Sequence, residues 1–228
     1  MHFLKFIVRL YVDASLHVSM AVLAFIWLTA LQFNIEVPLV FYGFVCACTI
    51  CCYNVLKFGV QFLDKGNALT AFYRYIMAIT LLAFLSALIL VFFLPPKLIK
   101  VFAGLGLLTF LYACSLFTNY GLRNLYGFKM GIVALVWTAV SVLCPLYFLD
   151  TYEAKPVTFL FLQRFLFVLV LLCPFEIKDA TQDALQLQTL PVVLGVLPTK
   201  IVATCFALGV IVLQALVPFE SFYANMGA

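Results

Sequence analysis

Seven long apolar runs constrain the fold of this chain more than any other feature of its sequence. A helix needs about 20 apolar residues to cross the hydrocarbon core of a bilayer, and each run is close to that length. We therefore predict an all-α fold, a polytopic membrane helix bundle of about seven transmembrane helices, with residues 1–228 as a single transmembrane helical domain. The expected spans are residues 16–33, 38–62, 73–94, 98–117, 129–149, 157–175 and 199–218.

The composition agrees with a lipid environment rather than with a water-soluble fold. Hydrophobic residues make up 67% of the chain and charged residues 10%, whereas soluble domains carry about 25% charged residues. The formal net charge is +4, but the sequence contains no cluster of basic residues. The lipid bilayer is therefore an expected partner and nucleic acid is not.

All eight cysteines lie inside apolar stretches, so they do not form the loop-based disulfide framework of a small secreted protein. Four of them form the sequence CACTICC at residues 46–52. Such a cluster could bind a soft metal ion. Because no histidine or further cysteine completes a ligand set, we interpret it as a packing face of small residues.

The basic residues predict which side of the membrane each loop faces. If the N-terminus is cytoplasmic, nine of the 13 lysines and arginines lie in inner segments, three in outer segments and Arg164 within a span. The positive-inside rule favours that orientation. We expect an integral protein of the inner (cytoplasmic) membrane of a bacterium, with residues 1–15 as an amphipathic lead-in that keeps Lys5 and Arg9 at the surface.

Three carboxylates follow the sixth run directly, in the segment PFEIKDATQDALQLQTLPVVLG at residues 174–195. Glu176, Asp179 and Asp183 are three and four residues apart, so on a helix they share one face. Like charges on one face repel, and Mg²⁺, which prefers oxygen ligands and usually binds substrate phosphates as well, would relieve this repulsion. The alternative is a solvated loop that ends the span. Lys178 could contact a phosphate or pair with Glu176.

Two further groups of polar residues lie near the predicted inner ends of spans. Asn54 needs a partner for its amide within the bundle, and Lys57, three residues later, either faces the interior or extends to the interface. Arg123 and Lys129 precede and begin the fifth run, where they either bind phosphate or only follow the positive-inside rule. Arg164, within the sixth run, is expected to face the interior and an acid or carbonyl partner.

The acidic segment resembles the second aspartate-rich motif of the UbiA superfamily of membrane prenyltransferases. The matching residues are Glu176, Asp179, Asp183, Thr189, Leu190, Pro191 and Gly195. The segment LRNLYGFKMGIVALVW is similar to the Arg-x-x-x-Gly-x-Lys loop of the same family. Its matching residues are Arg123, Gly127, Lys129 and Trp137. The order of the helices and a cytoplasmic site fit this resemblance along the whole chain.

This resemblance implies an enzyme that transfers a prenyl group from a polyprenyl diphosphate to a lipophilic acceptor, which can be aromatic, with the help of Mg²⁺. The candidate catalytic residues are Asp179, Asp183 and Asn54, and the candidate metal ligands are Glu176, Asp179 and Asp183. The candidate substrate-binding residues are Lys57, Arg123, Lys129 and Lys178. The first acidic motif of the family is altered here, because only its asparagine, Asn54, is kept. Its aspartate positions hold Val55, Phe58 and Phe62.

Two other functions compete with the enzyme. One is a catalytically inactive UbiA-like protein that binds an isoprenoid lipid or a partner protein. The other is a small transporter, which Arg164 within a span favours and the absence of an internal repeat opposes. Convergence of Asn54, Lys57 and the acidic face on one cytoplasmic cavity would favour diphosphate chemistry.

Overall fold

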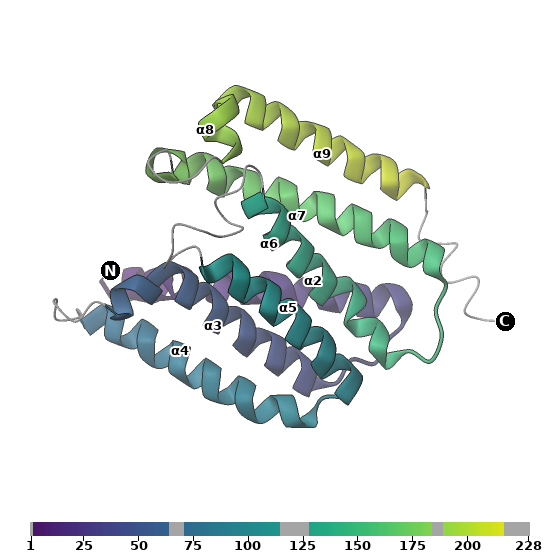
Figure 1. Ribbon diagram of the computed structural model, residues 1–228, viewed down its shortest axis with the longest axis horizontal. Coiled ribbons are helices and arrows are strands. Elements are labelled where there is room, and N and C mark those ends of the chain that lie inside the picture. The colour runs from purple at the N-terminus through teal and green to yellow at the C-terminus, as the bar shows by residue number, and fades with distance from the viewer. Residues whose placement is uncertain (1, 64–70, 115–127, 184–188, 217–228) are drawn as a thin grey trace. The chain divides into compact units, whose positions relative to one another are not determined.

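The computed structural model describes residues 2–63, 71–114, 128–183 and 189–216 (Figure 1). Within these ranges the regular structure is helical and contains no strand, so the predicted all-α fold is confirmed. Among the described residues, seven helical segments are long and apolar enough to cross a membrane, which confirms the polytopic bundle. These candidate spans are Leu16–Phe33, Leu39–Gly59, Phe72–Phe93, Pro96–Ala113, Lys129–Phe148, Ala154–Ala180 and Val196–Leu216.

The chain divides into two compact units, and the first consists of Met1–Leu28 and Glu36–Ala103. Its helices begin with α1 (His2–Asp13), and α1 is the amphipathic lead-in expected from the sequence, with Lys5 and Arg9 exposed. The further elements that lie wholly or partly in this unit are α2 (Leu16–Phe33), α3 (Leu39–Leu63), α4 (Ala71–Leu90), the 3₁₀ turn η1 (Val91–Phe93) and α5 (Pro96–Cys114).

Helices α3 and α4 lie side by side (Figure 1) and form the main packing contact of the first unit. Ala47, Ile50 and Ala83 are the buried centre of this contact, and Cys46 and Cys51 pack against them. Small side chains let the two helix backbones approach each other closely in a membrane. The cysteine-rich segment therefore contributes to helix packing, as the sequence predicted.

The second unit consists of Thr29–Ile35 and Gly104–Ala228. In it, α7 packs against α6, α8 and α9, and Figure 1 shows α9 running alongside α7. At Gly209 on α9 an added Cβ would lie 3.0 Å from a side-chain carbon of Leu166 on α7, so this contact is close. The elements are α6 (Phe128–Thr138), the π-helix η3 (Ala139–Leu143), the 3₁₀ turn η4 (Pro145–Phe148), α7 (Ala154–Asp183), α8 (Leu190–Leu194) and α9 (Val196–Leu216).

One predicted boundary is wrong. The sixth span is predicted to end at residue 175, but α7 continues through Pro174 to Asp183, and the short helix α8 follows at Leu190–Leu194. Proline removes one helical hydrogen bond, yet membrane helices tolerate it. Among the following residues, Glu176, Lys178 and Ala180 are good helix formers. The acids therefore belong to a helix that extends beyond the apolar run.

The predicted single domain and the cytoplasmic N-terminus stay predictions. The charge distribution along the sequence supports the orientation.

Candidate functional site

The last turns of α7 carry the predicted acidic residues. Glu176 is buried and Asp179 is half-buried, one helical turn apart, where the candidate span Ala154–Ala180 ends. Asp183 is the last residue of α7, and its side chain lies outside the described residues. The expected arrangement of the acids along one helix is therefore present in the backbone.

Glu176 forms an ion pair with Lys129, near the start of α6. The Lys129 Nζ atom lies 3.0 Å from Glu176 Oε1, and the two side chains are only 16% and 7% exposed. Charge-assisted hydrogen bonds of this length are roughly twice as strong as neutral ones. The structure thus joins a residue expected to bind a metal and one expected to bind phosphate.

The sequence offered Lys178, not Lys129, as the partner of Glu176. Lys178 is exposed, and residues two apart on a helix do not face each other. The numbers of residues between the α6–α7 connection and each side chain could have indicated that Lys129 lies beside Glu176. Lys129 precedes Leu149 by 20 residues and Glu176 follows Ala154 by 22, so an antiparallel pair of helices brings them to the same level.

The described residues at the end of α7 include two carboxylates that could hold a Mg²⁺ ion. Proteins usually hold Mg²⁺ with one or two carboxylates, while water and substrate phosphates complete the coordination. Glu176 and Asp179 supply two such carboxylates, and a carboxylate has about four acceptor positions, so contact with Lys129 does not exhaust Glu176. Among the described side chains no group of three His, Cys, Asp or Glu could hold a metal ion, and Asp183 lies outside them.

Asn54 connects two helices of the first unit. Its side chain is fully buried on α3, and its Nδ2 atom donates a hydrogen bond of 2.9 Å to Thr80 Oγ1 on α4. The Thr80 hydroxyl donates in turn to the carbonyl oxygen of Ile76 at 2.8 Å. The expectation that the amide finds a partner within the bundle is confirmed. The Asn54 Oδ1 atom has no hydrogen-bond partner in the part of the chain that the structure describes.

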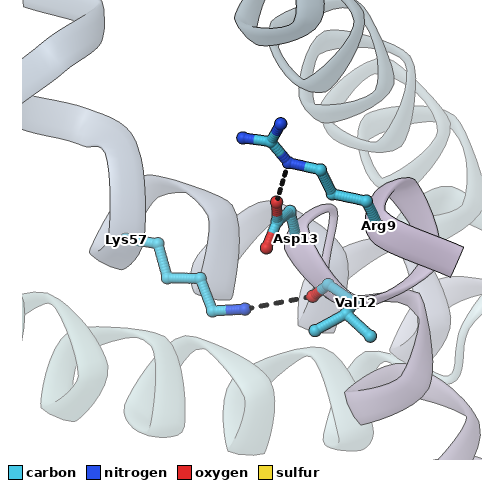
Figure 2. A network of polar contacts seen from close by, with 4 residues as sticks. All are labelled: Arg9, Val12, Asp13 and Lys57. Atoms are coloured by element: carbon cyan, nitrogen blue, oxygen red, sulfur yellow. Dashed lines mark hydrogen bonds and ion pairs between the residues drawn. The ribbon is translucent and has the colours of Figure 1, made fainter. Parts of the chain in front are cut away.

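Lys57 contacts the C-terminal end of α1. Its Nζ atom donates to the carbonyl oxygen of Val12 at 3.4 Å, and beside it Arg9 Nε lies 3.2 Å from Asp13 Oδ2 (Figure 2). A lysine at a helix C-terminus satisfies one of the last carbonyl groups and interacts favourably with the helix dipole. The sequence could not reveal this contact, because a backbone carbonyl carries no sequence signature.

The remaining candidates have different outcomes. Arg123 lies outside the described residues. Arg164 is buried, as expected for an arginine that faces the interior of the protein. Asn54 and Lys57 belong to the first unit, whereas Lys129 and Glu176 belong to the second. Their convergence on one cavity stays a prediction.

The tail of the predicted motif forms a helical junction. Thr189 precedes α8 in an extended conformation, and its carbonyl oxygen accepts hydrogen bonds from Val192 and Val193. Gly195, between α8 and α9, has a backbone φ of 89°, a value that residues other than glycine rarely adopt. The Thr-Leu-Pro and Gly elements therefore shape the return of the chain from α7 to α9.

Comparisons of the chain with protein-family models, with curated proteins and with solved structures find no match. The resemblance to the UbiA superfamily therefore rests on the motifs in this sequence.

Replacing Asn54 with alanine is expected to lower the free energy of unfolding by about 1–2 kcal/mol, because an interhelical hydrogen bond and packing volume are lost. Unfolding by dodecyl sulfate in mixed micelles would measure this change. Thr49→Val is the matched control, since the Thr49 hydroxyl donates to the carbonyl oxygen of Val45 in its own helix at 2.8 Å. Equal changes in both variants would contradict a bridging role for Asn54.

Proposed function

We propose that this chain is a UbiA-like integral membrane prenyltransferase, which transfers a prenyl group from a polyprenyl diphosphate to a lipophilic acceptor, for example an aromatic one. One observation carries this proposal. Glu176 and Asp179 lie one turn apart at the end of a candidate span, with the Lys129 ammonium group 3.0 Å from Glu176. This combination of metal-binding oxygens and positive charge suits a diphosphate at a membrane boundary.

The residues of the second unit have distinct parts in the proposed reaction. Asp179, Asp183 and Glu176 would hold Mg²⁺, which when bound neutralises charge on the diphosphate. Lys129, with Lys178 and Arg123 as further candidates, would stabilise the negative charge that develops on the departing diphosphate. The allylic carbon–oxygen bond breaks with its electron pair on the diphosphate, the acceptor forms the new bond to that carbon, and the acceptor loses a proton.

The proposed location follows from the same residues. Lys129 begins its candidate span and Glu176 lies near the end of the next, so their ion pair marks one membrane boundary. With the N-terminus cytoplasmic, as the basic residues favour, this boundary is the cytoplasmic face of a bacterial inner membrane. The prenyl diphosphate would then enter from the cytoplasmic leaflet.

A specific observation favours a second candidate function, a catalytically inactive UbiA-like protein that binds an isoprenoid or a partner protein. In the region of the altered first motif, Asn54 donates to Thr80, Lys57 donates to Val12, and the Phe58 ring lies 5.6 Å from the ring of Tyr73. These contacts hold helices together. A motif whose residues serve packing in this way need not support catalysis.

Turnover in proteoliposomes would test the proposed function. The purified full chain would be incubated with Mg²⁺, labelled prenyl diphosphates of several chain lengths and a panel of aromatic and lipid acceptors. We expect a prenylated product whose formation stops when a chelator removes Mg²⁺. Saturable binding of a prenyl diphosphate without any product would favour the inactive relative, and neither binding nor product would overturn both.

A further inference from the structure

Helix α1 has two chemically different faces. Its polar residues recur at helical spacing, and those with described side chains are Lys5, Arg9 and Asp13. At about 100° per residue these lie opposite an apolar face. That face is formed by Leu4, Ile7, Val8 and Tyr11, which are 67%, 45%, 54% and 43% exposed. A water-soluble protein would bury such a face, so it requires an apolar environment here.

The end of the α3–α4 pair holds α1 in place, all within the first unit. The ring of Phe6 lies 5.9 Å from the ring of Phe72 and 5.9 Å from that of Tyr75, both on α4. The Arg9 guanidinium lies 4.3 Å from the centre of the Phe72 ring. Lys57 of α3 completes the attachment through Val12 (Figure 2). Aromatic, cation–π and hydrogen-bonding contacts thus fix one side of α1. On the other side the Tyr11 ring lies 6.0 Å from the ring of His17 on α2, and the residues of the apolar face stay 43–67% exposed.

These contacts place α1 at the membrane boundary. Phe72 is the first residue of its candidate span, and Lys57 lies two residues before the end of the span Leu39–Gly59. Both spans therefore leave the bilayer at the level where α1 is attached. An apolar face exposed at this level meets the lipid at the junction of acyl chains and headgroups.

The dimensions of α1 and α2 exclude a role for α1 as part of a span. The 12 residues of α1 extend for about 18 Å, well short of the roughly 30 Å of a hydrocarbon core. Helix α2 has 18 residues and by itself covers about 27 Å of that thickness. Ser15, with a φ of 60°, lies between the end of α1 at Asp13 and the start of α2 at Leu16, so the two are separate helices.

We propose that α1 lies in the plane of the membrane interface, with its apolar face in the acyl boundary and with Lys5 and Arg9 on the phosphate groups of anionic lipids. Amphipathic helices with basic polar faces bind membranes in this manner. Figure 2 shows the two terminal nitrogens of Arg9 pointing away from Asp13, which is bonded to Nε. A guanidinium group suits phosphate because its donors match two phosphate oxygens. This proposal does not depend on the proposed enzymatic function.

The depth of α1 can be measured on the full chain in nanodiscs. Tyr11→Trp places an indole on the apolar face, and Lys5→Trp places one on the polar face as the matched control. After subtraction of the parent fluorescence, the indole in Tyr11→Trp should be quenched by lipids brominated near the headgroup and shielded from aqueous iodide. The indole in Lys5→Trp should show greater quenching by iodide. Equal iodide quenching in both variants would overturn the proposal, as would an indole in Tyr11→Trp that neither lipid nor iodide quenches, because protein would then cover that face.

The headgroup preference requires a separate measurement. Hydrogen exchange of the α1 amides would be compared in nanodiscs of phosphatidylcholine and of phosphatidylcholine mixed with phosphatidylglycerol. We expect slower exchange in the anionic discs than in the neutral discs. Lys5→Gln should reduce the ratio of the two exchange rates by about fivefold, because one cation near an anionic surface contributes about that factor. Lys155→Gln, at the start of α7, is the control that should change nothing. Equal exchange in the two lipids would remove the headgroup contact from the proposal.

Discussion

Lys129→Met is expected to lower the free energy of unfolding by about 3–5 kcal/mol, the usual effect of removing one partner of a buried ion pair. The reason is the burial of Glu176, whose side chain is only 7% exposed and contacts the Lys129 ammonium group at 3.0 Å. Without that group, the carboxylate loses a close opposite charge in surroundings where water cannot replace it. Unfolding by dodecyl sulfate in mixed micelles would give the change.

Two companion variants make this experiment specific. Lys178→Met removes an exposed lysine two residues from Glu176 and should change the free energy of unfolding by no more than about 0.5 kcal/mol. The double variant Lys129→Met with Glu176→Leu removes both charges, and replacing a buried ion pair with apolar residues is often neutral or stabilising. If Lys129→Met were as stable as Lys178→Met, the ion pair would not be desolvated.

The same variants separate stability from function. The double variant should stay folded, yet in an active prenyltransferase it loses one candidate metal ligand and one candidate phosphate contact. A stable double variant without turnover would assign the pair to the site. A stable double variant with normal turnover would mean that the ion pair only holds α6 and α7 together. The proposed function would then depend on Asp179.

The spans were predictable because hydrophobic run length is a local property of the chain. The predicted span 16–33 agrees with α2 at both ends, and the predicted span 199–218 overlaps α9 closely. The end of α7 was missed for a physical reason. Hydropathy marks the apolar run, whereas Glu176, Lys178 and Ala180 continue the helical hydrogen bonding past the end of that run.

The contacts at the candidate site were less predictable than the helices that carry it. Sequence spacing indicated that Asn54 needed a partner, but only packing of α3 on α4 selects Thr80. Lys57 was expected to face the interior or the interface, and its contact with the Val12 carbonyl depends on where α1 docks. Such pairs join residues far apart in the chain, so their identity is a property of the fold.

Asp179→Asn is expected to reduce magnesium-dependent prenyl transfer by about 10²–10³-fold, the effect of removing one preorganised group that stabilises a transition state. The amide keeps the size of the side chain and removes the negative charge that a divalent cation needs. Asp179 is half-buried, so the fold should not depend on this charge. Steady-state turnover in proteoliposomes would give the change in kcat/KM, and unfolding of the same preparation would show that the variant is intact.

Asp150→Asn is the matched control, because Asp150 is an exposed acid just before the opposite end of α7. Its turnover should equal that of the parent chain. Calorimetric titration with Mg²⁺ and a prenyl diphosphate gives a second readout, in which Asp179→Asn should lose the magnesium-dependent part of binding while Asp150→Asn keeps it. An Asp179→Asn variant that binds and reacts like the parent would mean that the acids only form the solvated end of α7 and do not bind the metal or the diphosphate. The enzyme proposal would then fail, whereas the interfacial position proposed for α1 would be unaffected.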